Sequence, residues 1–137
     1  MPSAVSKVPA APSSEAERHF MAKLGFETDC WDVHASMQDA SPDFVLVDVR
    51  SPEMYARKHI PGAVNIPHGK MVAAYMSRYP KDTLFVVYCA GPHCNGSTKA
   101  ALNLSRLGYP VKEMIGGLTG WADEGFAFHS VQDAYAA

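Results

Sequence analysis

Two short apolar runs, each followed by a loop and a helical pattern, most constrain how this chain folds. Residues 44–47 read Phe-Val-Leu-Val, and residues 84–88 read Leu-Phe-Val-Val-Tyr. Unbroken runs of this length are typical of strands buried on both faces of a parallel sheet. Further strands are predicted near residues 26–29, 63–66 and 111–115, and helices near 14–24, 32–38, 52–58, 70–79, 96–107 and 118–124. This alternation predicts an α/β fold, with a central parallel sheet of about five strands and helices on both faces.

The length of 137 residues fits one domain of ordinary size. We expect a flexible lead-in at residues 1–13, a single domain at 14–130 and a C-terminal tail at 131–137. Ser14 and Glu17 have the spacing of a capping box, and Phe20, Met21 and Leu24 form an apolar stripe. We therefore expect the first helix to be short and packed against the domain.

Composition excludes several classes of partner. The formal net charge is -2 and 19% of the residues are charged, so no basic surface is expected for nucleic acid or an anionic membrane. Residues 1–14 hold no apolar block long enough for a secretory signal or a membrane span. The three cysteines are an odd number, which favours a reducing compartment in which thiols do chemistry. We therefore expect a cytoplasmic protein.

The strongest candidate for chemistry is Cys89, because it stands where the second apolar run ends. A loop rich in Gly and Pro follows it, and a helical pattern opens at Ser97 and Thr98. In a strand–loop–helix unit of this kind, the loop amides and the positive end of the helix converge on one point and favour a thiolate. Reactive sites of open α/β sheets lie outside the carboxyl ends of the strands. Cys89 is therefore the predicted catalytic residue.

The loop after Cys89 is predicted to stabilise negative charge at this thiol. Its backbone N–H groups would supply positive potential without a proton to lose. Gly91 and Gly96 are expected to adopt positive φ so that the amides can point inward. The predicted substrate-binding residues are Ala90, Gly91, Pro92, His93, Asn95, Gly96 and Ser97.

Three residues near this loop have two interpretations each. Cys94 is either a resolving thiol that reacts with Cys89 or a small loop residue without chemistry. His93 either lowers a thiol pKa or is merely exposed. Lys99 either attracts an anionic donor or points to solvent. The remaining cysteine, Cys30, is expected to be a buried structural thiol, since no titratable cluster surrounds it in the sequence.

Several motifs together resemble the rhodanese domain of sulfurtransferases. They are Asp48-Val49-Arg50-Ser51-Pro52-Glu53, His59-Ile60-Pro61-Gly62-Ala63, Asn65-Ile66-Pro67, Tyr88-Cys89, and Gly116-Gly117 followed by Trp121. The resemblance covers residues 29–128. It implies a rhodanese-like fold, in which the cysteine takes sulfane sulfur from a small donor as a persulfide and passes it to a thiol or another nucleophile. A protein thiol is a further partner of this kind.

The chain also departs from the family pattern. Many rhodaneses have an Arg after the catalytic Cys and a second Arg before the helix, whereas Ala90 follows Cys89 here and the next Arg is Arg106. The loop is longer than usual and resembles a Cys-x-Gly-Pro-x-Cys variant. The missing Arg weakens the expectation of thiosulfate as the donor, whereas a bulkier or neutral polysulfide stays compatible.

The other polar and aromatic residues of these motifs are expected to support the structure of the loop and not to react. A hydrogen-bonded network that ties strand ends to the following helix is expected from Asp48, Arg50, Glu53 and His59. Trp121 is expected to pack in the core beside the active loop. Lys99 joins this supporting set. Gly62, Gly116 and Gly117 are explained by their backbone conformation.

Three alternatives can be weighed on the same residues. A cysteine phosphatase or arsenate reductase would need an Arg to hold the oxyanion, and this loop has none. A zinc site would need a fourth ligand beside Cys89, His93 and Cys94, so neither a metal nor a cofactor is expected. The rival to the enzyme is a redox or sulfide-responsive interaction module in which Cys89 and Cys94 form a switchable disulfide.

Overall fold

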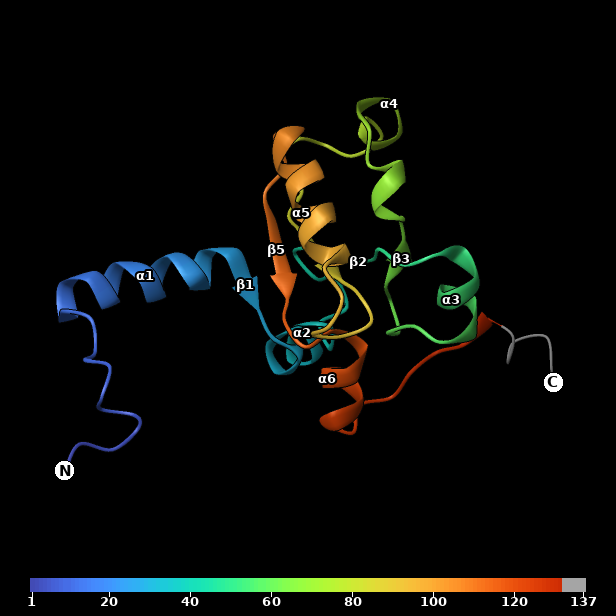
Figure 1. The fold of residues 1–137 in the computed structure, drawn as a ribbon. Helices are drawn as coiled ribbons and strands as arrows, with labels where there is room; N and C mark the ends of the chain where they lie inside the picture. The colour runs from blue at the N-terminus through green and yellow to red at the C-terminus, as the bar shows by residue number, and fades with distance from the viewer. Residues whose placement is uncertain (132–137) are drawn as a thin grey trace.

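A five-stranded, wholly parallel sheet forms the centre of the fold (Figure 1), and its strand order is β1-β5-β4-β2-β3. The computed structural model describes residues 1–131. The strands are β1 (Glu27–Thr28), β2 (Val45–Asp48), β3 (Val64–Asn65), β4 (Phe85–Tyr88) and β5 (Val111–Met114). The helices are α1 (Ser13–Phe26), α2 (Cys30–Ser36), α3 (Pro52–Arg57), the 3-10 helix η1 (His68–Lys70), α4 (Ala73–Met76), α5 (Gly96–Arg106) and α6 (Gly117–Asp123). This arrangement confirms the predicted α/β fold.

Each face of the sheet is covered by its own apolar cluster. On one face, Ala100 and Leu104 of α5 and Met76 of α4 pack against Phe85 and Val87 of β4. On the other face, α2 and α6 cover the sheet with Cys30, Val33, Leu118 and Trp121, which pack with Leu46 and Val86. The middle strand β4 is buried along its whole length. Its unbroken apolar run therefore has the cause inferred from the sequence, which is burial on both faces.

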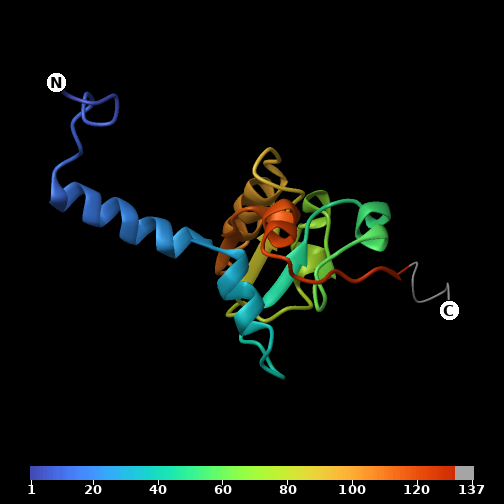
Figure 2. The ribbon, with the colours of Figure 1, turned by 90° about the horizontal axis from the view of Figure 1, so that it is seen from below.

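The first helix does not pack as expected. Figures 1 and 2 show α1 projecting away from the sheet beyond the β1 edge, and none of its residues is buried. The side chains of the predicted apolar stripe, Phe20, Met21 and Leu24, are 60%, 66% and 73% exposed. The expected capping box is also absent. Pro12 is the N-cap and its carbonyl accepts from the amides of Glu15 and Ala16, so the helix begins at Ser13.

One further helix was wrongly predicted. The segment expected to run as one helix divides into η1 and the short α4, with Met71 and the extended Val72 between them. Met71 and Met76 are buried, as expected, but Val72 is 54% exposed because it lies outside the helical repeat. None of the helices in the described part of the chain combines the length and apolar character that a membrane crossing needs. The predicted tail at 131–137 lies outside the described residues except for Val131.

Candidate active site

Cys89 lies at the carboxyl end of β4, the middle strand of the sheet. It is 6% exposed and belongs to the apolar cluster beneath α5. Loop residues 90–95 then lead directly into α5. The first amides of a helix have no partner within the helix, and Asn95 at the N-cap position makes no side-chain cap. Cys89 therefore occupies the position, between a central strand and a helix N-terminus, at which parallel sheets present their reactive groups.

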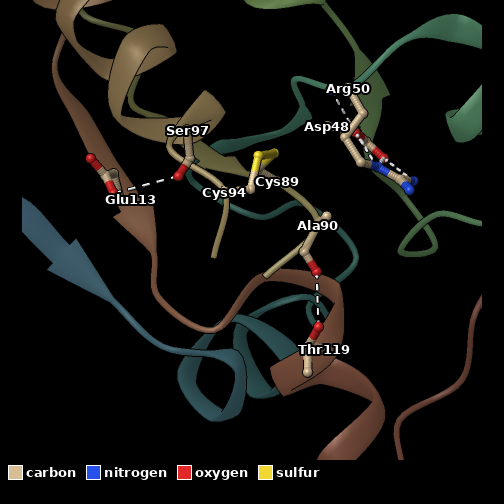
Figure 3. The surroundings of a disulfide bond; sticks show 8 residues. All are labelled: Asp48, Arg50, Cys89, Ala90, Cys94, Ser97, Glu113 and Thr119. Atoms are coloured by element: carbon tan, nitrogen blue, oxygen red, sulfur yellow. Dashed lines mark hydrogen bonds and ion pairs between the residues drawn. A yellow bond between two sulfur atoms is a disulfide. The ribbon is translucent and has the colours of Figure 1, made fainter. Parts of the chain in front are cut away.

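Cys89 and Cys94 are joined by a disulfide (Figure 3). Their Cα atoms are 6.3 Å apart, a normal separation for a bridged pair. The loop turns back on itself to allow this, because the amide of Cys94 donates to the carbonyl oxygen of Gly91 at 3.0 Å. The structure thus brings together the two thiols whose relationship the sequence left open. Whether Cys94 acts on a persulfide stays a prediction.

Gly91 and Gly96 shape the loop by leaving space, not by adopting unusual backbone angles. The prediction of positive φ was wrong at both positions. A Cβ on Gly96 would lie 2.9 Å from Sγ of Cys89 and 3.4 Å from Sγ of Cys94. A Cβ on Gly91 would lie 2.5 Å from Oγ1 of Thr119. The bridge therefore sits directly against the first turn of α5, and the loop sits directly against α6.

The start of α6 holds the loop from the other side. The amide of Leu118 donates to the carbonyl of Cys89 at 3.1 Å, and both the amide and Oγ1 of Thr119 donate to the carbonyl of Ala90, at 3.0 and 3.2 Å (Figure 3). Gly117 has φ +56°, and a Cβ there would lie 2.5 Å from the carbonyl oxygen of Cys89. The expected backbone roles of Gly62, Gly116 and Gly117 are borne out by their positive φ. Sequence reasoning missed Thr119, because a single Thr in a helix carries no signal of its own.

A pocket of about 720 Å³ opens between the cysteine loop, the start of α5 and the end of β5. Cys89, Cys94 and all of the predicted binding residues except Gly96 line it. The pocket also has a charged residue that the sequence did not indicate, Glu113 of β5. Its Oε2 accepts from Oγ of Ser97 at 3.5 Å (Figure 3). The two thiols and this carboxylate therefore share one cavity.

The supporting residues predicted around the site do not line this pocket. Asp48 is fully buried at the end of β2 and forms an ion pair with Arg50, whose guanidinium Nη2 lies 2.8 Å from Oδ2. The same guanidinium donates to the carbonyls of Met54 and Lys58, so it ties the C-terminal end of α3 to the end of β2. Asp48 and Arg50 thus form part of the network that the sequence suggested. Its other two expected members lie apart from this pair, because Glu53 is exposed and His59 bonds to the carbonyl of Tyr55. Lys99 is exposed on α5 and is absent from the pocket lining.

The buried Asp48 also binds the residue before the catalytic candidate. The hydroxyl of Tyr88 donates to Oδ2 of Asp48 at 3.0 Å and accepts from the amide of Ile60 at 3.1 Å. Burial, together with the negative charge of Asp48, raises the pKa of Tyr88 far above its ordinary value, so the phenol stays protonated. These bonds fix the strand end from which Cys89 emerges.

His59 and Trp121 serve the packing of the fold and do not line the pocket. Nδ1 of His59 lies 2.7 Å from the carbonyl oxygen of Tyr55, and its ring stacks on that of Tyr55. The backbone of His59 pairs with that of His129. Trp121 is buried beneath the sheet, and its Nε1 donates to the carbonyl of Ala127 at 2.9 Å. Both side chains therefore act in packing, and Trp121 belongs to the helix that contacts the loop.

Cys30 is the third thiol and lies apart from the pair. Its Sγ donates to the carbonyls of Ile115 and Gly117, each at 3.6 Å. Burial, and to a smaller extent the charges of Asp29 and Glu124, raises the pKa of Cys30 to about 11. A protonated, buried thiol is a poor nucleophile, in agreement with the expected structural role. Residues 1–131 contain no group of three His, Cys, Asp or Glu side chains arranged to hold a metal ion.

Comparison with known proteins places this geometry in a family. Residues 30–124 match the model of the rhodanese-like domain. The chain belongs to the rhodanese-like domain family. The thiosulfate sulfurtransferase PspE of Escherichia coli K12 is 37% identical over 73 residues, which cover 53% of this chain and 68% of that protein. A sulfurtransferase from Allochromatium vinosum is 36% identical over 85 residues, covering 61% of this chain and 76% of that protein.

The rhodanese-like fold also matches solved structures. The BH2092 protein of Bacillus halodurans is 39% identical and superposes with a TM-score of 0.83 over 88% of each chain. Some relatives are much longer than the domain they share. The chain spans 34% of the length of one of them, the HTH-type transcriptional regulator Rv0324 of Mycobacterium tuberculosis. Rhodanese-like domains thus occur both alone and within larger proteins.

Proposed function

We propose that this chain is a sulfurtransferase that carries sulfane sulfur as a persulfide on Cys89. The observation that carries the proposal is the position of Cys89, at the end of the central strand and in a 720 Å³ pocket, with a second thiol within bonding reach. The naming of several relatives as sulfurtransferases supports the same reaction class. Sulfur transfer needs a reactive thiol, a cavity for the donor and a way to release the bound sulfur. Cys89, the pocket and Cys94 are our candidates for these three parts.

The reaction starts from the reduced enzyme. The Cys89 thiolate attacks the terminal sulfur of a persulfide donor R–S–SH, the donor S–S bond breaks, and Cys89–S–SH and RS⁻ result. An acceptor thiolate then attacks the outer sulfur of Cys89–S–SH, which yields R′–S–SH and restores the Cys89 thiolate. Thiosulfate would react in the same way and release sulfite. No external oxidant is needed in either half.

The loop stabilises the charge that moves through these steps. The Cys89 thiolate and the deprotonated outer sulfur of the resting persulfide are both anionic, and they would lie beside the first turn of α5. The unpaired amides of that turn and the positive end of the helix dipole favour negative charge there. Gly96 allows the sulfur to approach the helix this closely, since a Cβ would meet Sγ of Cys89 at 2.9 Å.

The persulfide on Cys89 can also react with Cys94. Its thiolate can attack the inner sulfur of Cys89–S–SH, which forms the Cys89–Cys94 disulfide and releases HS⁻. That product is the bridge seen between the two residues. A small-molecule or protein thiol must then reduce the bridge, with formation of its own disulfide, before the next cycle. We place the cycle in a reducing compartment such as the cytoplasm for this reason.

Intact mass spectrometry tests the proposal. The reduced full chain, freed of reductant, is mixed with thiosulfate or with a low-molecular-weight persulfide and quenched with iodoacetamide. Wild type should gain one sulfur or convert to the disulfide with release of sulfide, and Cys94→Ser should accumulate the sulfur adduct. Cys89→Ser should gain nothing. An adduct that persists in Cys89→Ser would contradict the assignment.

A redox-responsive module is the second candidate, and the disulfide itself favours it. In this case Cys89 and Cys94 would switch between dithiol and disulfide to control binding to another protein. The two functions differ in turnover. If no sulfane donor is consumed, and the bridge still forms at a potential near that of the cytosolic glutathione pool, the redox module is the better explanation.

A further inference from the structure

The pocket beside Cys89 contains an acidic group where an anion-binding site would contain basic ones. Apart from the two cysteines, the titratable side chains among its lining residues are His93 and Glu113. No Lys or Arg of the described part of the chain is among the lining residues, and Lys112, next to Glu113 on β5, donates to the carbonyl of Leu24. Arg50 is paired with Asp48, and Lys99 is exposed outside the pocket. A formal negative charge therefore faces any donor that approaches the thiols.

Glu113 is fixed in this position by the sheet. It lies on β5 and pairs with Val87 of β4, and Val87 precedes Cys89 by two residues. Side chains alternate between the faces of a strand, so Val87 and Cys89 point to the same face, the one that packs against α5. Val111 and Glu113 of β5 share this face. Ser97, in the first turn of α5, donates to the carboxylate. Glu113 is half-buried and cannot turn away without losing this contact.

The carboxylate occupies the region in which the positive end of α5 would otherwise attract an anion. Negative charge near a helix N-terminus is stabilised by the helix dipole, so Glu113 offsets part of the potential that favours an anionic ligand. Glu113 is half-buried, and repulsion between two like charges that are partly out of water is stronger than in bulk solvent. A dianion such as thiosulfate is affected most, whereas a cationic carrier group gains attraction.

We propose that Glu113 is a specificity-determining residue that selects sulfur donors with an uncharged or cationic carrier group over thiosulfate and other anionic donors. This inference rests on the proposed sulfurtransferase function. It assigns the substrate class as low-molecular-weight or protein persulfides that present positive charge next to the sulfur. The transferred atom is the terminal sulfur of R–S–SH, and the leaving group is RS⁻, as in the reaction above.

Three matched persulfides and thiosulfate test the assignment. The persulfides of cysteamine, 2-mercaptoethanol and 3-mercaptopropionate carry a positive, a neutral and a negative group on similar chains. Reduced wild-type protein, Glu113→Gln and Glu113→Asp are each mixed with each donor and quenched with iodoacetamide. The initial rate of sulfur loading is obtained by intact mass, counting the persulfide and the Cys89–Cys94 disulfide together.

Wild type should load fastest with the cysteamine persulfide, with a rate on the order of tenfold above that of the 3-mercaptopropionate persulfide. Glu113→Gln should reduce this ratio to about twofold and raise loading by thiosulfate by roughly fivefold to tenfold. Glu113→Asp keeps the charge and should keep the wild-type order. Glu53→Gln is the matched control, because it removes one exposed carboxylate from α3, outside the pocket.

The outcomes separate the two proposals. If the donors load at measurable rates but their order is the same in Glu113→Gln as in wild type, Glu113 does not set specificity and this inference is overturned alone. If Glu53→Gln changes the ratios as much as Glu113→Gln does, the effect is one of net charge and the inference is likewise overturned. If no donor loads Cys89 in any of the proteins, the sulfurtransferase function itself is wrong.

Discussion

Gly96, in the first turn of α5, lies directly against Cys89. A Cβ added at position 96 would be 2.9 Å from Sγ of Cys89. The same Cβ would be 3.4 Å from Sγ of Cys94, so it would press on both sulfurs of the bridge. A thiol can rotate away from such a contact, whereas a bridged sulfur is held by its partner. The side chain at position 96 therefore affects the oxidised form more than the reduced form.

Gly96→Ala should consequently make the Cys89–Cys94 disulfide easier to reduce. Gly96 has no positive φ and begins a helix, so Ala should leave the stability of the reduced protein within about 1 kcal/mol of wild type. Redox titration against glutathione, read by thiol alkylation and intact mass, should show a higher midpoint potential than in wild type. Gly69→Ala is the control, since nothing lies within 4 Å of its Cβ. An unchanged midpoint in Gly96→Ala would contradict the prediction.

Gly117→Ala should destabilise the protein by two separate effects. Gly117 has φ +56°, which is unfavourable for Ala, and its Cβ would lie 2.5 Å from the carbonyl oxygen of Cys89. Gly108 isolates the first effect, because it has φ +88° with nothing within 4 Å. In urea unfolding of the reduced proteins, Gly108→Ala should lose about 1 kcal/mol and Gly117→Ala about 2–4 kcal/mol. Equal losses would mean that α6 moves away from the loop without cost.

The sheet could be predicted from the sequence because its local and global signals agree. The runs at 44–47 and 84–88 are apolar since both faces of β2 and β4 are covered, and the turn residues after them mark the strand ends. The first helix shows the opposite case. Its stripe of Phe20, Met21 and Leu24 has helical spacing, but spacing does not specify which surface, if any, the stripe contacts.

The position of the loop that begins at Cys89 was predictable, but its geometry was not. The sequence placed Cys89 between a strand and a helix, and the structure has it between β4 and α5. The contacts that shape the loop come from residues distant in sequence. Thr119 binds the carbonyl of Ala90, and Glu113 reaches the pocket only through the pairing of β5 with β4. Neither residue belongs to a motif, so neither could be recognised before the strands were placed side by side.

The exposed stripe of α1 leads to a stability prediction. Leu24 is 73% exposed and Leu104 of α5 is fully buried. Leu24→Ala should change the free energy of unfolding by less than about 0.5 kcal/mol, whereas Leu104→Ala should lower it by about 2–5 kcal/mol. Urea denaturation followed by circular dichroism at low protein concentration measures both. A loss above 2 kcal/mol for Leu24→Ala would show that the stripe is buried against another surface in solution.

The raised pKa of Cys30 predicts a loss of stability in alkaline solution. Burial holds the folded-state pKa near 11, above the ordinary value of 9.0, so the folded chain keeps a proton that the unfolded chain releases. The Cys30 thiol makes its full contribution to the free energy of unfolding below pH 9. This contribution is lost as the pH rises toward 11, at no more than about 1.4 kcal/mol per pH unit. Urea unfolding of wild type and Cys30→Ala at pH 8 and pH 10 measures it, with Cys89 and Cys94 kept as the disulfide in both. Wild type should lose more stability between the two pH values than Cys30→Ala does. Because Tyr55 and Tyr88 also have raised pKa values, the difference between the two proteins is the relevant quantity, and parallel losses would contradict the assignment to Cys30.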